Sequence, residues 1–446
     1  MSNEGNHFWE TIKDSIEKIS KDCDTKWRKR KRIIGTKFLI LFIFKLVLSK
    51  NKQGYGSVLG EIWDDYSQKD LTPPQKSIPS ASSLCEARQK LPEAVFKDLN
   101  TELILTFDKE TEEGEWNGHR VFSVDGSRLN LPIELMENGY KPWNKKLHHN
   151  PHGLMSSLYR LSTGVVYDFV MTNKYSEREH ALNHLQLMKP NDVVVFDRGY
   201  FSYLMLHQCI EKDIFVLFRI GKNFGNKKIL EFINSDKTDE IIEYIPSLGS
   251  TYDFKKQGYN LDFRPLRLRL VKWTFKDTQY TGATTLLSHD YTIQSLSDLY
   301  HSRWGIEELY KVSKTMIDVE DFHSKTELGI KQELYAHFVL INIARFLELA
   351  VSKNNPKSPQ KAYMKTAYGS VDVYKINFKN CLLITGRYLH DIIYTPYKKF
   401  IHYCLPKILK AIGRIKHKIR PNRRFARKSF KPYNKGIYNE VLAATP

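Results

Sequence analysis

The chain has 446 residues, of which 41% are hydrophobic, and this composition excludes a globally disordered protein. Its length predicts about two to four domains. There are 69 Lys and Arg residues against 50 Asp and Glu residues, a net charge of +19. Such an excess of positive charge predicts a polyanionic partner, most simply nucleic acid.

The N-terminal region, residues 1–110, is predicted to be helical and to bind DNA. Its most apolar stretch, Phe38–Leu48, is shorter than the roughly 20 residues that a membrane span needs. It follows the basic run Lys26–Arg32, but it begins too late for a signal peptide. We expect a buried helix and no membrane partner; a helix lying on a membrane surface is the weaker alternative.

A proline-containing loop, Leu71–Ser80, precedes another predicted helix of this region. That helix begins near Ser82, a capping serine, and breaks at Pro92. A helix-turn-helix module is possible here, but periodicity does not identify a recognition helix.

Two apolar runs further along the chain each lead into an aspartate. The run Val121–Val124 precedes Asp125, and Val193–Phe196 precedes Asp197. Both runs have the composition of buried strands, and glycine follows each aspartate within two residues. Asp before Gly is also ordinary turn chemistry. Ligands of α/β sheets gather at the carboxyl ends of strands, so both aspartates are candidate site residues.

The segment between and after these runs alternates between strand and helix patterns. The predicted elements are a hairpin of Leu154–Leu161 and Val165–Met171, helices over Glu177–Met188 and Phe201–Lys212, and a strand over Ile214–Ile220. This order predicts an α/β fold with an antiparallel start.

A polar stripe lies on the next predicted helix. If residues 300–314 are one helix, then Tyr300, Arg303, Glu307 and Lys314 fall within an arc of roughly 60°. A carboxylate beside two cations and a phenol suits metal-assisted phosphodiester chemistry. The alternative is a solvated helix face with ion pairs four residues apart.

These motifs together resemble the DDE transposases of the insertion sequence 4 family. The spacing of Tyr300, Arg303, Glu307 and Lys314 matches that family's Y-R-E-K signature, and the DRGY run at Asp197 is similar to its second-aspartate motif. The resemblance implies an RNase H-like core with Asp125, Asp197 and Glu307 as the catalytic, metal-binding acids. It further implies Mg²⁺, for which Mn²⁺ can substitute, and DNA contacts by Tyr300, Arg303 and Lys314.

The resemblance also implies a domain order. The core would occupy residues 111–221 and 291–352, separated by a mainly β insertion at 222–290. Some relatives use an aromatic residue of this insertion to stabilise a flipped base, but here the nearest aromatics are Trp273 and Tyr280. The route of excision therefore stays open.

Residues 353–446 form a basic C-terminal region after a long apolar helix predicted over Glu327–Ser352. From Ile392 to Asn439 the chain has fourteen Lys or Arg and no acidic residue. A solvated or dimer-forming tail is one interpretation. In a DNA-processing chain we expect phosphate contacts, above all from Arg423, Arg424, Arg427 and Lys428.

Two other features bear on the kind of site. His148, His149 and His152 lie close enough in sequence to bind a transition metal, although polar loop histidines are more common. Five scattered cysteines with no CxxC pair argue against a disulfide framework or a zinc finger, and favour reduced thiols in the cytoplasm.

The sequence thus predicts a transposase that binds the ends of an insertion sequence, cleaves DNA strands and joins the 3′ ends to target DNA by two-metal phosphoryl transfer. Its partners would be double-stranded DNA at those ends, target DNA and a second copy in a homodimer. It would be cytoplasmic, and associated with the nucleoid when bound to DNA. The alternatives are an RNase H-like nuclease or domesticated transposase that cuts without integrating, and an inactive DNA-binding repressor.

Overall fold

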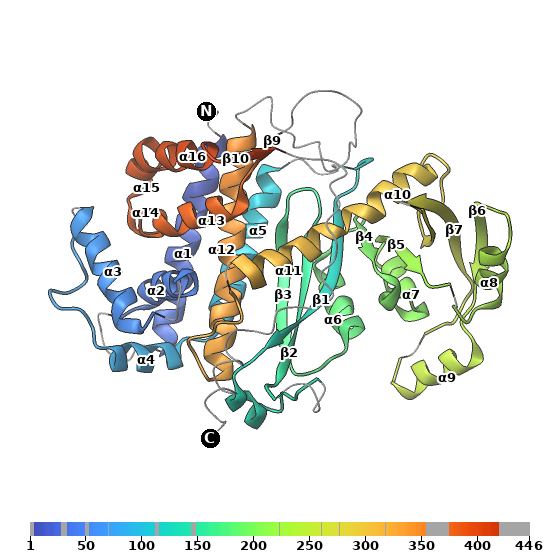
Figure 1. Cartoon of the computed structure of the whole chain (residues 1–446), viewed down its shortest axis with the longest axis horizontal. Helices are drawn as coiled ribbons and strands as arrows, with labels where there is room; N and C mark the ends of the chain where they lie inside the picture. The colour runs from blue at the N-terminus through green and yellow to red at the C-terminus, as the bar shows by residue number, and fades with distance from the viewer. Residues whose placement is uncertain are drawn as a thin grey trace, which may run out of the picture.

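A mixed eight-stranded sheet lies at the centre of the molecule, flanked on one side by a helical body (Figure 1). The computed structural model describes residues 4–27, 34–49, 53–69, 71–111, 116–143, 149–222, 224–259, 261–275, 277–316, 318–353 and 374–418. The strand order is β3-β2-β1-β4-β5-β8-β7-β6.

Five of these strands form the predicted core. They are β1 (Val121–Asn130), β2 (His152–Arg160), β3 (Val165–Thr172), β4 (Val193–Phe196) and β5 (Phe215–Ile220). β1, β2 and β3 are antiparallel, whereas β4 and β5 run parallel to β1. The helices α6 (Glu177–His184) and α7 (Tyr203–Glu211) connect β3 to β4 and β4 to β5. This is the RNase H-like arrangement, so the predicted fold class is confirmed.

The predicted hairpin is present in β2 and β3. Gly164 closes its turn with φ of 73° and donates its N–H to the carbonyl of Arg160 at 2.9 Å. A side chain rarely adopts this left-handed conformation, which explains glycine at this position.

The sequence suggested that β1 ends at Asp125, but the strand continues past this residue. It pairs with β4 only as far as Ser123, but its antiparallel ladder with β2 continues from Asp125, opposite Ser157, to Asn130. The Gly-Ser pair after Asp125 looked like a turn, yet β2 supplies hydrogen-bond partners across it. Asp125 therefore lies in mid-strand, just past the point where the parallel partner ends.

The segment 222–290 contributes strands to the same sheet. It contains α8 (Lys227–Asn234), β6 (Asp239–Tyr244), α9 (Leu248–Lys256), β7 (Leu266–Phe275) and β8 (Thr278–Thr284). β8 pairs antiparallel with β5, so these strands extend the edge of the core sheet. The expected mainly β segment thus holds three strands and two helices.

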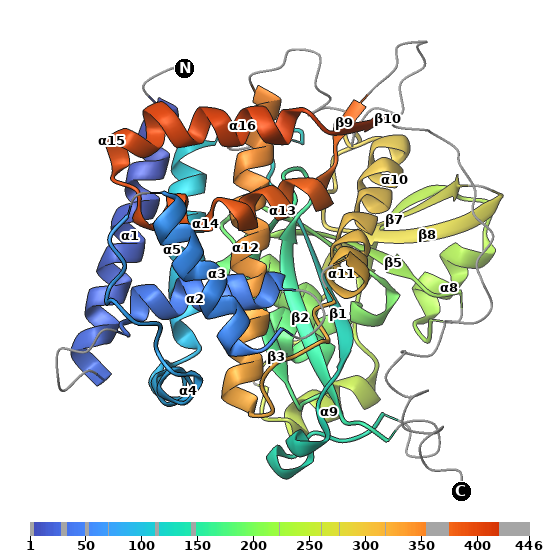
Figure 2. The ribbon, with the colours of Figure 1, turned by 60° about the vertical axis from the view of Figure 1, so that its left-hand side comes forward.

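The helices from both ends of the chain pack together around α12 (Glu327–Lys353), and α12 and α5 both pack on β3 (Figure 2). They are α1 (Glu4–Trp27), α2 (Thr36–Leu48), α3 (Tyr55–Gln68), α4 (Ala81–Lys90), α5 (Ala94–Glu110), α13 (Phe378–Arg387), α14 (Leu389–Tyr394), α15 (Tyr397–Lys399) and α16 (Leu405–Gly413). Lys13 of α1 donates to the carbonyl of Thr395 at 2.9 Å, and the ring of Trp9 meets that of Phe400 edge-on. A small pair of strands, β9 (Tyr374–Ile376) and β10 (Lys416–Lys418), lies beside them.

Three local predictions meet their test in this helical body. The apolar stretch Phe38–Leu48 is buried within α2, as expected. The cap of α4 is Ser80, whose Oγ accepts the N–H of Ser83 at 3.2 Å, and the prediction of Ser82 was wrong by two residues. All five cysteines are free thiols, which confirms the absence of a disulfide framework.

α12 is the described helix that is long and apolar enough to cross a membrane by length and composition. Within its most apolar window, 78% is buried inside the protein. Arg88 of α4 also binds it through Glu333 Oε1 at 2.7 Å. These contacts are those of a core helix.

Candidate active site

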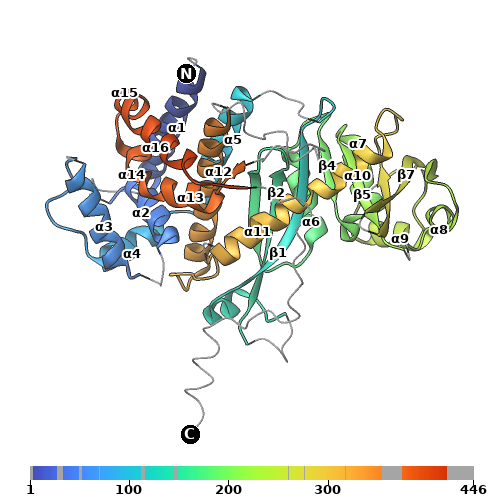
Figure 3. The same cartoon turned by 45° about the horizontal axis from the view of Figure 1, so that its top comes forward.

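The three predicted acids come from three elements that meet on one face of the sheet. Asp125 lies in β1, Asp197 follows β4, and Glu307 lies in the first turn of α11 (Trp304–Met316). α11 runs across β1, to which it packs (Figure 3). Asp197 also caps the short 3₁₀ helix Arg198–Tyr200, since its Oδ1 accepts the N–H of Arg198 at 2.7 Å.

The helix predicted over residues 300–314 is two helices. α10 (Ile293–Ser302) ends before Arg303, which keeps helical dihedral angles, and α11 begins at Trp304. The N–H of Ile306 binds the carbonyl of Arg303 at 3.1 Å, a tighter turn than that of an α-helix. A Cβ at Gly305 would come within 3.2 Å of the Tyr159 ring, so this close packing against β2 accompanies the break.

Two members of the polar stripe contact the acids. Tyr300 is buried and donates its hydroxyl to Asp197 Oδ1 at 3.2 Å. Arg303, also buried, binds Glu307 Oε1 through Nη2 at 2.6 Å. Arg303 is a charged neighbour of Asp125 and Asp197 as well, so one guanidinium acts on all three acids.

Lys314, in contrast, is held near the far end of β1. Its Nζ donates to the carbonyl of Arg128 and lies 3.6 Å from Glu320 Oε1. Glu320 in turn accepts the side-chain N–H of Asn130 at 3.0 Å. The structure thus places Lys314 along β1 from Asp125, beside Arg128 and Glu320.

The two aspartates differ in their electrostatic surroundings. Burial raises the pKa of Asp125 to about 7, and the charges of Glu177 and Glu307 add to this effect against Arg303 and the Gly126 N–H. The pKa of Asp197 is lowered, because the Arg198 N–H, Arg219 and Arg303 outweigh the effect of its burial. Asp197 is therefore ionised at neutral pH, whereas Asp125 is poised to gain or lose a proton.

Sequence reasoning missed several residues that surround the acids. Arg219 of β5 approaches Asp197 Oδ1 with Nε at 3.3 Å, and Tyr310 of α11 donates to the carbonyl of Asp125 at 2.7 Å. Glu177 starts α6 and lies against Gly126. A strand arginine such as Arg219 carries no sequence signal of its role; only the acidic start of the predicted helix pointed towards Glu177.

Hard carboxylate oxygens suit Mg²⁺ or Mn²⁺. No three His, Cys, Asp or Glu side chains of the described residues already form a group that could hold a metal ion. Asp125 is nevertheless half-buried and has no ion-pair partner within the part of the chain that the structure describes, and Asp197 and Glu307 flank the same arginine. The donor set fits a divalent cation that would lie among these acids.

The remaining candidates lie elsewhere. His152 is buried in β2, where its Nδ1 accepts the N–H of Trp143 at 3.3 Å, and His149 is exposed. His148 lies outside the described residues, as do Arg423, Arg424, Arg427 and Lys428.

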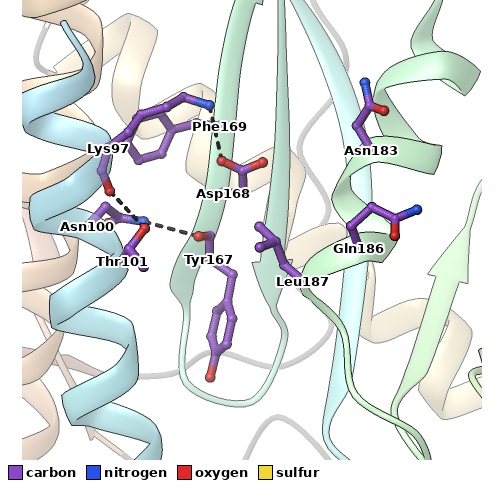
Figure 4. Close-up of a pocket in the computed structure, with 9 residues that line it drawn as sticks. All are labelled: Lys97, Asn100, Thr101, Tyr167, Asp168, Phe169, Asn183, Gln186 and Leu187. Carbon is purple, nitrogen blue, oxygen red and sulfur yellow. Dashed lines mark hydrogen bonds and ion pairs between the residues drawn. The ribbon is translucent and has the colours of Figure 1, made fainter. Parts of the chain in front are cut away.

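A second polar group lies at a pocket between α5, β3 and the end of α6 (Figure 4). Asp168 lines this pocket and accepts from His184 Nδ1 at 2.8 Å, while His184 Nε2 contacts Ser156 Oγ at 3.1 Å. This hydrogen-bonded series of Asp, His and Ser resembles a nucleophilic triad. Ser156, however, is fully buried in β2, where a substrate cannot reach it. We regard the group as a structural network.

Comparisons with known proteins agree on one family. A sequence model described as "Transposase DDE domain" matches residues 116–343. A probable transposase for insertion sequence element IS5377 of Geobacillus stearothermophilus is 24% identical over 164 residues, which are 36% of this chain and 41% of that protein. A putative transposase for element IS4SA of Synechocystis sp. is 23% identical over 279 residues, 60% of this chain and 71% of that protein.

The match to the first relative therefore spans about two fifths of its length. Among solved structures, the piggyBac transposase synaptic complex with hairpin DNA aligns with 90% of this chain and 84% of that chain, at 11% identity and a TM-score of 0.42.

Proposed function

Because the chain belongs to the family of transposase DDE domains, we propose that it is a transposase that binds the ends of an insertion sequence, cleaves DNA there and joins the 3′ ends to target DNA. The observation that carries the proposal is the meeting of Asp125, Asp197 and Glu307 around Arg303. All four residues lie within the matched segment 116–343.

Asp125, Asp197 and Glu307 would hold divalent ions, with Mg²⁺ as the natural ion and Mn²⁺ as a substitute. When bound, such ions activate a water or a 3′-hydroxyl and stabilise the leaving oxygen. The family implies dependence on a divalent metal, and the carboxylate chemistry of the site supports this choice of ions.

The neighbouring side chains orient the acids. Tyr300 is buried and bound to Asp197, which supports a role in positioning Asp197 more than a role as a stacking surface for DNA. Arg219 holds the same carboxylate from β5. Arg303 fixes Glu307 and supplies positive charge where a DNA phosphate would enter, and Lys314 would contact phosphate further along β1.

We further propose that the active form is a homodimer that brings two DNA ends together, and that the protein joins the nucleoid when bound to DNA. Arg423, Arg424, Arg427 and Lys428 would bind the DNA backbone. Neutralising these four residues should weaken DNA binding and lower its salt slope by about one unit for each lost phosphate contact. An unchanged slope would instead assign the tail to solvent or to the dimer.

The test of the proposed function uses linear DNA that carries the inverted repeats flanking the gene, with Mg²⁺ and a second DNA as target. A transposase cuts at one defined end and joins the 3′ end to the target. A nuclease cuts without joining, and a repressor binds without cutting. Asp125→Asn is the matched inactive control, because it preserves shape while it removes one charge.

A further inference from the structure

A fourth carboxylate, that of Glu177, approaches the backbone beside Asp125. Glu177 is the first residue of α6, after the cap Ser176. A Cβ built on Gly126 would lie 3.0 Å from both Cδ and Oε1 of Glu177. The carboxylate therefore packs directly against the residue that follows Asp125, and this close approach explains the glycine at position 126.

Glu177 is exposed, and no ion pair joins it to a cation of the described residues. Two acids of the same sign so close to one another repel unless a cation lies between them or one of them is protonated. A cation bound beside Asp125 would relieve this repulsion.

A buried hydroxyl points to the same place. Tyr200, from the DRGY run, is 2% exposed, and its hydroxyl has no hydrogen-bond partner of good geometry among the described residues. Burial, the charges of Asp125 and Glu177 and a side-chain interaction with Glu177 raise the pKa of Tyr200, so its hydroxyl lies near both carboxylates and within reach of Glu177. A buried hydroxyl without a partner is costly, so a bound ligand or a shift of Glu177 would satisfy it.

We propose that Glu177 is a fourth carboxylate of the catalytic centre, oriented by Tyr200, and that it strengthens the binding of a divalent cation at Asp125. The proposal rests on the proposed function, in which Asp125 binds metal. Glu177 acts as a direct ligand or through a water on the ion; in either case its charge raises the affinity of the site.

A simpler role for Glu177 is to stabilise the N-terminus of α6, where acids interact favourably with the helix dipole. Glu179 lies in the same first turn and is equally exposed. Glu179 should interact with the helix dipole as Glu177 does, but it is not among the atoms nearest to Gly126. Glu179→Gln is therefore the matched control.

The first experiment titrates Mn²⁺ into the full-length, DNA-free protein at pH 7.5 and measures free Mn²⁺ by electron paramagnetic resonance. We expect Glu177→Gln to lower the affinity by about tenfold or more, Glu179→Gln to leave it unchanged, and Asp125→Asn to abolish the site. Equal affinities for the Glu177→Gln and Glu179→Gln variants would overturn the role of Glu177 alone. Unchanged binding by Asp125→Asn would overturn the metal site itself, and the proposal with it.

The second experiment uses the contact with Gly126. A methyl group at this position displaces the flexible end of Glu177 without touching backbone, and Gly126 has ordinary strand dihedrals, so Gly126→Ala should fold normally. We expect Gly126→Ala to weaken Mn²⁺ binding as Glu177→Ala does, and the double variant to be no weaker than Glu177→Ala. Additive losses in the double variant would contradict an effect that acts through Glu177.

Discussion

The neighbouring strands β1 and β4 have charged residues in two places, and these charges are paired in one place but not in the other. At their N-terminal ends, Arg120 and Asp192 form a buried, two-pronged ion pair, with Nε–Oδ1 at 2.7 Å and Nη2–Oδ2 at 2.6 Å. Asp108 adds a third bond to Arg120 at 2.8 Å. Further along, Asp125 in the middle of β1 and Asp197 just after β4 have no such buried pairing.

The difference teaches which charges serve the fold and which serve chemistry. Around Arg120 each carboxylate has a close guanidinium. Around Asp125, in contrast, Arg219 pairs with Asp197, Arg303 pairs with Glu307, and Glu177 adds a further negative charge. In a chain of net charge +19, this site thus has more carboxylates than guanidinium groups. This excess of carboxylates suits a site that is completed by divalent ions.

The largest effect should come from the three acids around Arg303. Asp125→Asn, Asp197→Asn and Glu307→Gln each remove a ligand charge while keeping shape, so each should reduce strand cleavage by at least about a hundredfold. Binding to end DNA should stay close to wild type. Single-turnover cleavage with saturating protein measures the first effect, and a mobility-shift titration the second.

The control for that series is Glu308→Gln. Glu308 is exposed, next to Glu307, and points to another side of α11. It should keep most of the activity. If Glu308→Gln loses as much as Glu307→Gln, the assignment of Glu307 fails.

The N-terminal ends should respond in stability instead. Asp192→Asn leaves Arg120 buried with part of its charge uncompensated, and breaking such a pair typically costs about 3–5 kcal/mol. The midpoint of urea unfolding should fall clearly below that of the wild type, whereas Asp197→Asn should change it little. Equal midpoints for Asp192→Asn and the wild type would contradict a structural role for this pair.

A smaller effect should appear as a pH dependence of stability in metal-free buffer. The pKa of Asp125 is about 7 in the folded protein, above its ordinary value of 3.8, because the carboxyl is buried. Between these values the folded state holds a proton that the unfolded state has released. The contribution of Asp125 to stability therefore falls as pH rises from about 4 to about 7 and stays low above that.

Asp125→Asn removes this dependence, so the variant should melt at a higher temperature than the wild type at pH 8, and the two should converge near pH 4. Thermal melts in EDTA across this range measure the difference. A wild type that gains stability relative to Asp125→Asn as pH rises from 4 to 7 would show that the carboxyl is not destabilised by burial.

The smallest effect should come from Tyr300→Phe, which removes one hydrogen bond to Asp197 and keeps the buried ring. The loss of about 1–1.5 kcal/mol of orientation would slow cleavage by roughly tenfold. DNA affinity should not change. A large loss of affinity with unchanged single-turnover cleavage would instead assign Tyr300 to DNA contact.

Sequence patterns predicted the elements whose structure depends mainly on neighbouring residues in the chain. The hairpin of β2 and β3, the strand β4 and the helix α12 follow from apolar periodicity and turn residues. The continuation of β1 past Asp125 did not follow, because the Gly-Ser pair looks like a turn and only β2, some 30 residues later, supplies its ladder.

The site divides in the same way. Asp125, Asp197 and Glu307 could be proposed from sequence because each lies in a recognisable motif, whereas Arg219 and Glu177 come near them only through the folding of β5 and α6 against β1 and β4. The break at Arg303 was hidden because Arg and Trp are compatible with a continuous helix, and the close packing of Gly305 against Tyr159 that accompanies it is a tertiary contact.

If Asp125 within β1 and Asp197 after β4 bind divalent metal, as we propose, a metal-specificity switch tests this most directly. A thiolate binds Mg²⁺ poorly but accepts the softer Mn²⁺. Asp125→Cys and Asp197→Cys should therefore be inactive in strand cleavage with Mg²⁺ and recover activity with Mn²⁺, while the matching serine variants recover none. If the cysteine variants cleave DNA equally well with Mg²⁺ and with Mn²⁺, Asp125 and Asp197 are not metal ligands.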